Sequence, residues 1–190
     1  MNKRIALTGG SGHLGYHIGK VLIEKKYNVL LLLRRHNAYT HELVRKGAKF
    51  KIVNFHNVRS IKSALKNYKV LINTASNNPY HPKKEILKEN LTITKNILNS
   101  TIGTKIQKVI HISSSIIFER KKNNKQLINE SSKINYDENE YVKSKILGEK
   151  FIENFNKRQK IDISRIYPGW IISDQDVYLT PPSKFFYENV

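Results

Sequence analysis

A tyrosine and a lysine four residues apart form a pair in this sequence that could do chemistry. Tyr141 and Lys145 lie in a stretch with helical spacing, and residues four apart share one face of a helix. A lysine ammonium beside a phenol stabilises the phenolate and lowers the pKa of the tyrosine toward the operating pH. Such a tyrosine could donate a proton to a carbonyl oxygen while a hydride reaches the carbon. The spacing Tyr-x-x-x-Lys is common by chance in a lysine-rich chain, so the spacing alone is weak evidence. The position of the pair, between the fifth and sixth apolar runs, makes it informative.

Three consecutive serines follow the fifth apolar run, residues 109–112. Ligands of parallel α/β sheets lie beyond the carboxyl ends of the strands, so a hydroxyl here could hydrogen-bond the oxygen of a substrate. The alternative is ordinary turn chemistry, in which serine is common. The triplet consists of Ser113, Ser114 and Ser115.

A glycine-rich loop separates the first apolar run from the first helical stretch. Its spacing, G-x-x-G-x-x-G, puts glycine at positions 9, 12 and 15. Gly9 permits a turn with positive φ, Gly12 lets a pyrophosphate approach the backbone, and Gly15 lets the helix pack close to the sheet. The phosphates would meet free N–H groups at a helix N-terminus. The loop residues expected to contact a dinucleotide are Thr8, Gly9, Ser11, Gly12, His13, Leu14 and Gly15.

The end of the second apolar run indicates which dinucleotide binds. Proteins that bind NAD place an acidic residue there to hold the ribose hydroxyls. This chain instead has Arg34 and Arg35, with no carboxylate nearby. An arginine pair can clamp a 2′-phosphate through charge-assisted hydrogen bonds, which favours NADP over NAD. The alternative is that both are ordinary surface bases in a very basic chain.

Apolar runs alternate with helical patterns along the chain, which predicts a parallel sheet with helices on both faces. Ser60 is expected to cap a short helix, residues 119–136 to form a loop, and Pro168-Gly169 to end the last strand. The expected strands are residues 5–7, 29–33, 50–53, 70–72, 109–112 and 161–166. The expected helices begin near residue 14 and near residue 60, and span about 86–98 and 137–157.

Composition bounds the function classes. The 190 residues include 34 Lys and Arg against 15 Asp and Glu, a net charge of +19, and no cysteine. The basic residues are spread along the chain rather than gathered in a stripe, so we expect no specific nucleic-acid binding, although the field would help to gather an anionic cofactor. No cysteine thiolate can bind metal, and His13 and His17 lack a third ligand, so no metal site is expected.

These motifs together resemble the extended or atypical branch of the short-chain dehydrogenase/reductase superfamily. The resemblance runs over residues 3–172 and rests on residues 8–15, 109–115, 141–145 and 165–169, in family order. It implies a Rossmann-type doubly wound fold. It also implies that Ser114, Tyr141 and Lys145 form the catalytic set, with Lys145 also holding the nicotinamide ribose. Further roles implied by resemblance fall on Asn90 in support of the active site, Ala75 on the adenine-ribose path, Arg34 at the NADP phosphate, and Pro168 and Gly169 at the nicotinamide.

The chain also departs from the family pattern. Asn54 stands where the family often has an aspartate near the adenine, which would weaken cofactor binding. Extended members continue much further and build a substrate-binding region from that part. We therefore expect residues 1–173 to form the NAD(P)-binding domain, and residues 174–190 to be the start of a truncated substrate region or a tail.

The function expected from these observations is an NADP-dependent oxidoreductase that reduces a carbonyl, or oxidises an alcohol, of a small organic molecule. One alternative is a nucleotide-sugar epimerase or dehydratase with bound NAD, against which Leu33-Arg34 argues. Another is a non-catalytic dinucleotide-binding module or a remnant. No apolar run is long enough to span a bilayer and no signal peptide is visible, so a cytoplasmic location is expected. The resemblance also suggests a homodimer through the helices at 86–98 and 137–157.

Overall fold

The computed structural model describes residues 4–77, 85–119, 127–135 and 139–173. In this part of the chain six strands form one parallel sheet in the order β3-β2-β1-β4-β5-β6. The predicted doubly wound sheet is therefore confirmed. The strands are β1 (Arg4–Thr8), β2 (Asn28–Leu33), β3 (Lys49–Ile52), β4 (Val70–Asn73), β5 (Lys108–Ile112) and β6 (Asp162–Ile166).

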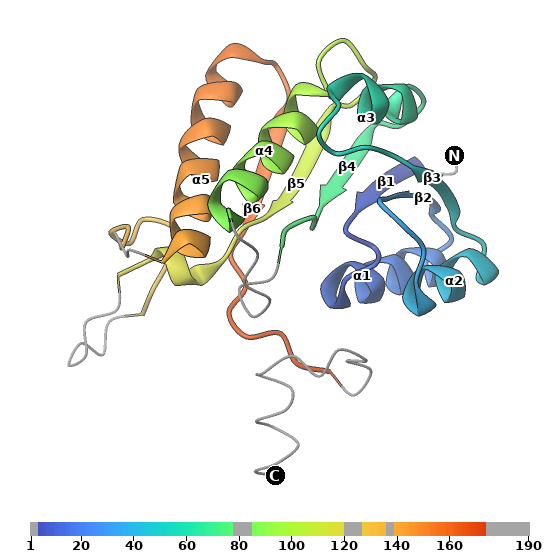
Figure 1. Cartoon of the computed structure of the whole chain (residues 1–190), viewed down its shortest axis with the longest axis horizontal. Coiled ribbons are helices and arrows are strands. Elements are labelled where there is room, and N and C mark those ends of the chain that lie inside the picture. Colours follow the sequence, from blue (N-terminus) through green and yellow to red (C-terminus); the bar gives the residue numbers. More distant parts are fainter. Residues whose placement is uncertain (1–3, 78–84, 120–126, 136–138, 174–190) are drawn as a thin grey trace.

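Helices cover both faces of the sheet, and Figure 1 shows α4 and α5 side by side on one of them. The helices α1 and α2 pack on the opposite face, over β1 and β2. A short 3₁₀ turn, η1 (Ser115–Ile117), follows β5. The α-helices are α1 (His13–Glu24), α2 (Ala38–Arg45), α3 (Val58–Leu65), α4 (Ile86–Asn99) and α5 (Glu140–Arg158).

Alternating side chains of the central strands supply two separate cores, because successive residues of a strand point to opposite faces. In β1, Ile5 and Leu7 join the cluster under α1 and α2. Ala6 joins the cluster under α3, α4 and α5. Burial on both faces explains why β2 reads as an unbroken apolar run of residues 29–33.

Two local features differ from the sequence prediction. The helix α2 was not predicted, since its apolar positions are few. Asn37 and Thr40 start it with reciprocal hydrogen bonds between side chain and backbone. The predicted cap at Ser60 is wrong, because Asn57 has the extended backbone of a cap and its side chain accepts the N–H of Ser60.

The stretch at 119–136, predicted as a loop, is described only in part. Within it, Ile134 forms an isolated antiparallel bridge with Phe118, the residue just before the stretch, while residues 120–126 and 136–138 lie outside the described residues. The predicted tail at 174–190 also lies outside them. Among the helices that the structure does describe, none is both long and apolar enough to cross a bilayer.

Candidate functional site

The glycine loop has the geometry that its spacing predicts. Gly9 has a φ of 74°, and its carbonyl accepts the N–H of Gly12 at 2.9 Å. A Cβ on Gly15 would collide with the Gly9 backbone and would lie 2.8 Å from the hydroxyl of Thr74, at the end of β4. The loop can therefore close this tightly only if both positions lack side chains.

The N-terminus of α1 follows the glycine loop directly, and no side chain caps it. Gly12 is its N-cap and supplies no side-chain hydrogen bond, and it is exposed. Of the atoms in the described residues, a Cβ there would meet only the Gly9 carbonyl oxygen, at 3.4 Å. Backbone N–H groups at an uncapped helix N-terminus attract phosphate. The cradle thus fits the pyrophosphate of a dinucleotide. The predicted loop residues Ser11, His13 and Leu14 are partly buried.

The loop after β2 is joined to the glycine loop by a residue that sequence reasoning missed. The side-chain amide of Asn37 donates to the backbone oxygen of Ser11 at 2.8 Å, while its oxygen caps α2. Arg34 and Arg35 precede it and are both exposed. The sequence did contain a signal for the start of α2, because asparagine is a preferred helix cap and Asn37 precedes Thr40 by three residues.

Other predicted cofactor residues lie at the ends of β1, β3 and β4. Thr8 is fully buried, and its hydroxyl donates to Asn73 Oδ1 at 2.6 Å, so its side chain supports the loop from beneath. Asn54 is exposed and its side chain accepts the N–H of His56 at 2.9 Å. Ala75 is partly buried, and its N–H donates to Asn73 Oδ1 at 3.2 Å.

A buried polar chain continues from these residues into β5. The side-chain amide of Asn73 lies 3.0 Å from Nδ1 of His111, which is 4% exposed. Burial, together with the positive charges of Lys145 and Arg165, lowers the pKa of His111 to about 3. His111 is therefore neutral at physiological pH, and Nδ1 accepts from Asn73. Its contacts are those of a hydrogen-bonded core residue.

The structure brings Tyr141 and Lys145 together at the start of α5. The Lys145 Nζ lies 5.4 Å from the centre of the Tyr141 ring. Asn139 caps the helix by accepting the Tyr141 N–H at 2.8 Å, which sets the first turn that carries the pair. Burial lowers the pKa of Lys145 to about 8, and the carboxylate of Glu149 opposes that shift.

The three serines after β5 have different environments. Ser114 is the cap of η1, and its hydroxyl accepts the Ile116 N–H at 3.4 Å. Ser113 is buried. The N–H of Ser115 donates to the Pro168 carbonyl at 3.0 Å, and a Cβ on Gly169 would lie 3.7 Å from the Ser115 hydroxyl. The serine turn and the Pro168-Gly169 segment are therefore neighbours.

Asn90 is buried between the loop after β4 and the start of α5. It is 4% exposed, its side-chain oxygen accepts the Asn77 N–H at 2.7 Å, and its amide lies 3.4 Å from the Ser144 hydroxyl. Ser144 in turn donates to the Tyr141 carbonyl at 2.6 Å. Asn90 thus connects the loop after β4 with the first turn of α5.

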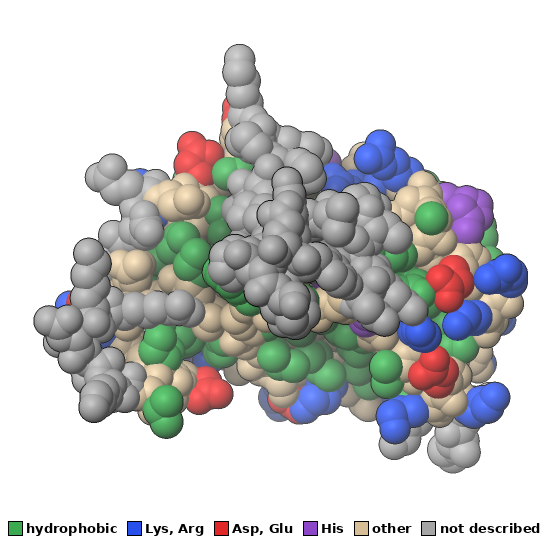
Figure 2. Space-filling model, turned by 90° about the horizontal axis from the view of Figure 1, so that it is seen from below, with side chains coloured by type: hydrophobic (Ala, Val, Ile, Leu, Met, Phe, Trp, Pro, Cys, Tyr) green, Lys and Arg blue, Asp and Glu red, His purple; other side chains and the backbone are tan. Residues whose placement is uncertain are grey.

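The glycine loop, Arg34, the serine turn and the pair of Tyr141 and Lys145 follow the carboxyl ends of strands or lie at the start of the helix next to them (Figure 1). The strand order reverses between β1 and β4, where ligands of such sheets bind. Seen from below, Figure 2 shows Lys and Arg side chains scattered with carboxylates between them rather than gathered in one stripe. The geometry suits a dinucleotide beside a proton-donating phenol.

The chain is similar to known proteins in sequence and in fold. Over 185 residues the chain is 29% identical to the mouse (Mus musculus) protein named sterol-4-alpha-carboxylate 3-dehydrogenase, decarboxylating. The match covers 94% of this chain and 49% of that protein. The chain thus spans about half the length of this curated relative.

Solved structures share the fold. The crystal structure of gox2253 matches with a TM-score of 0.84 at 18% identity, over 97% of this chain and 56% of that one. Gre2 from Candida albicans, solved in complex with NADPH, matches with a TM-score of 0.75 at 22% identity, over 90% of this chain and 58% of that one. The model of the NAD dependent epimerase/dehydratase family matches residues 5–178. The chain therefore belongs to the NAD-dependent epimerase/dehydratase family.

Proposed function

We propose that this chain supplies the dinucleotide-binding and proton-transfer part of an NADP-dependent oxidoreductase acting on a carbonyl or hydroxyl of a small organic molecule. The observation that carries the proposal is the common location of two features. The uncapped N-terminus of α1 and the pair of Tyr141 and Lys145 both lie at the carboxyl edge of the sheet. One feature suits the phosphates of a dinucleotide and the other suits a reacting oxygen.

The choice of NADP rests on the loop after β2. Arg34 and Arg35 are exposed there, and residues 33–37 contain no carboxylate that would repel a 2′-phosphate. The hydrogen bond from Asn37 to the backbone oxygen of Ser11 ties this loop to the glycine loop, which supports a role for the arginines at the 2′-phosphate. Guanidinium groups bind phosphate through paired, charge-assisted hydrogen bonds. Gre2, which was solved with NADPH, has the same fold.

In the proposed reaction the chain's own residues orient the substrate and move one proton. The dinucleotide, when bound, supplies or accepts the hydride. Tyr141 donates its phenolic proton to the substrate oxygen in the reducing direction, and Lys145 stabilises the phenolate that remains. Ser114, or its neighbour Ser115, is the hydroxyl proposed to hold the substrate oxygen, because both follow β5 at this edge.

The first test is a titration of the purified chain with NADPH and with NADH, followed by nicotinamide fluorescence. We expect tighter binding of NADPH, and Arg34→Ala should weaken NADPH binding by about tenfold or more while NADH binding changes little. Arg158→Ala is the matched control, because it removes the same charge from an exposed arginine in the last turn of α5.

Two outcomes would contradict the proposal. Equal weakening in the Arg34 and Arg158 variants would mean that the arginine acts only through net charge. Tighter binding of NADH, or NAD retained through purification, would instead favour the epimerase or dehydratase chemistry of the family.

A further inference from the structure

The chain that follows β6 returns across the carboxyl edge of the sheet and contacts α1. Residues 167–173, here called the strap, are neither helix nor strand and run below the carboxyl ends of the strands (Figure 1). At the far end of the strap, the Ser173 hydroxyl lies 2.9 Å from Nε2 of His17, on α1. In the sheet, β5 and β4 lie between β6 and β1, the strand that α1 follows. Since neighbouring strands are about 4.8 Å apart, the strap crosses roughly 14 Å of this edge.

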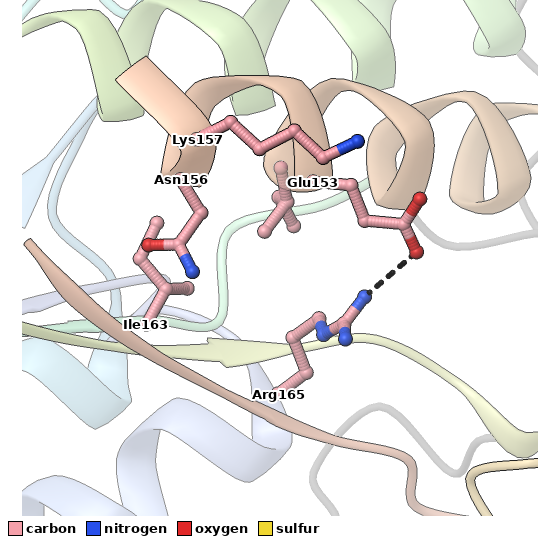
Figure 3. A pocket seen from close by; sticks show the side chains of 6 residues that line it. Glu153, Asn156, Lys157, Ile163 and Arg165 are labelled. Atoms are coloured by element: carbon pink, nitrogen blue, oxygen red, sulfur yellow. Dashed lines mark hydrogen bonds and ion pairs between the residues drawn. The ribbon is translucent and has the colours of Figure 1, made fainter. Parts of the chain in front are cut away.

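The start of the strap is anchored on α5 and on the serine turn. The Tyr167 hydroxyl donates to the buried Glu149 carboxylate at 2.8 Å, and the Pro168 carbonyl accepts an N–H of the serine turn at 3.0 Å. Arg165, two residues before the strap, donates to Glu149 and also to Glu153 of α5, as Figure 3 shows for Glu153. The strap therefore leaves β6 from a fixed point beside the serine turn.

The far end of the strap contacts a histidine whose ring is packed in place. The ring of His17 lies edge-on to that of His13, with centroids 4.9 Å apart, and to that of Tyr16, at 5.0 Å. Tyr16 is 2% exposed, and its hydroxyl donates to Glu42 of α2 at 2.6 Å. His13 is the first residue of α1, directly after the glycine loop. His17 thus presents Nε2 to the strap from a well-packed helix, one turn beyond the phosphate cradle.

The strap crosses the region proposed for the dinucleotide. That region contains the reversal of strand order between β1 and β4, with the glycine loop after β1 and the serine turn after β5. The two anchors of the strap lie at the two ends of this path, because one is the serine turn and the other is α1. A dinucleotide that extends from the phosphate cradle to the serine turn would therefore lie between the strap and the sheet.

We propose that the strap closes over the bound dinucleotide and that the contact between His17 and Ser173 is its latch. His17 is then a positioning residue, because it acts on the dinucleotide through the strap. The proposal rests on the proposed function, since it concerns the release of the same dinucleotide. Release requires the strap to open, and opening breaks the latch, so a chain without the latch should release its dinucleotide faster.

A small set of variants separates the latch from ordinary packing. His17→Phe keeps a ring beside Tyr16 but removes the nitrogen that faces Ser173. Ser173→Ala removes the hydroxyl, and the double variant removes both groups. His17→Gln is the matched control, because its side-chain amide can lie close to the position of Nε2 and still hydrogen-bond the hydroxyl.

The first readout is the rate at which NADPH and NADH dissociate from the whole chain, measured by stopped-flow nicotinamide fluorescence. His17→Phe and Ser173→Ala should each raise both rates by about fivefold, the factor that one typical hydrogen bond contributes to an equilibrium. The double variant should release no faster than either single variant, because the two groups act through one contact. His17→Gln should release both dinucleotides at nearly the wild-type rate.

The two dinucleotides keep this test separate from the test of cofactor choice. Arg34→Ala is expected to act on NADPH, because only NADPH carries the 2′-phosphate. The latch variants should act on NADPH and NADH alike, because the strap covers the part that both share.

Trp170, the single tryptophan of the chain, lies within the strap and provides a second readout that needs no dinucleotide. It is 71% exposed, so its own packing constrains it little. In the free chain, the fluorescence anisotropy of Trp170 should fall in His17→Phe and in Ser173→Ala, because a strap without its latch moves more freely. It should stay near the wild-type value in His17→Gln.

Unchanged release rates in His17→Phe would overturn the latch, even if NADPH binds well. Rates that multiply in the double variant would also overturn it, because independent effects do not come from one contact. Should His17→Phe fail to fold, Ser173→Ala decides the question, because Ser173 lies outside the helices and strands. In a chain that binds neither dinucleotide, the proposed function is contradicted. Lower Trp170 anisotropy in the variants would then still support the latch, and unchanged anisotropy would overturn it as well.

Discussion

Tyr141 carries a sharp prediction at the scale of single residues. Replacing it with phenylalanine removes the proton donor but keeps the ring beside Lys145, which lies 5.4 Å from its centre. We expect Tyr141→Phe to lower turnover by about 100-fold or more, the usual contribution of a general acid, while NADPH binding stays nearly intact. Steady-state kinetics over a carbonyl panel, combined with the fluorescence titration, would measure both quantities.

The matched control is Tyr68→Phe, which removes a hydroxyl from a partly buried ring packed against the core under α3 and α4. It should leave turnover unchanged. Equal turnover in Tyr141→Phe and the wild type would rule out the proton-transfer role. A loss of NADPH binding in Tyr141→Phe would mean instead that the phenol supports the cofactor site.

A second question about single residues is which serine contacts the substrate oxygen. Sequence analysis assigned the substrate contact to Ser114, and this stays a prediction. The structure adds Ser115 as a second candidate, because the Ser114 hydroxyl caps η1 whereas the Ser115 hydroxyl would lie 3.7 Å from a Cβ on Gly169. Only the way the turn folds distinguishes the two, since neighbours of the same type are equivalent in a sequence pattern.

At the scale of secondary-structure elements, a polar chain joins the ends of β1, β4 and β5 through Thr8, Asn73 and His111. The pKa of His111 is about 3 in the folded chain, against about 6.5 when unfolded. The unfolded chain therefore takes up this proton first as the pH falls. Folding stability is present above pH 6.5 and is lost progressively as the pH falls from about 6.5 toward 3.

We accordingly expect His111→Gln to flatten the acid side of the stability profile, because glutamine does not titrate and its oxygen can still accept from Asn73. Between pH 7 and 5 the wild type should lose about 2 kcal/mol more unfolding free energy than the variant. Urea denaturation at both pH values measures this difference. His41→Gln, at an exposed histidine, is the control, and parallel losses in the wild type and His111→Gln would contradict the buried, neutral assignment.

At the scale of the whole molecule, the net charge of +19 should act on cofactor binding through salt. The Debye length shrinks from about 30 Å at 0.01 M to about 8 Å at 0.15 M ionic strength, so long-range attraction is screened. We expect NADPH affinity to fall more than NADH affinity over that range, because the 2′-phosphate adds negative charge. Titrations at both ionic strengths test this, and equal losses for the two dinucleotides would argue against a role for the phosphate.

The chain spans about half the length of its curated relative, and the expected homodimer through α4 and α5 stays a prediction. The two helices do pack against each other along the sheet (Figure 1). Sedimentation of the purified chain would measure its oligomeric state.

The sequence by itself determined the strands, most helices and the glycine loop. These depend on local spacing: an apolar run is buried on both faces, and Gly9 and Gly15 are required where the loop meets its own backbone. The Tyr141–Lys145 pair was predictable for the same reason, since one helical turn joins its members.

Only the tertiary structure decided the contacts between distant segments. The side-chain amide of Asn37 donates a hydrogen bond to the Ser11 backbone oxygen, and the Thr8 hydroxyl donates one to Asn73 on the neighbouring strand. Arg165 on β6 donates a hydrogen bond to the Glu149 carboxylate. The periodic pattern of apolar residues does not predict such pairs, because the order of the strands in the sheet and the direction of each side chain decide which distant residues meet. In a chain rich in lysine, arginine and asparagine, many residues could have made these contacts, and packing selected a few of them.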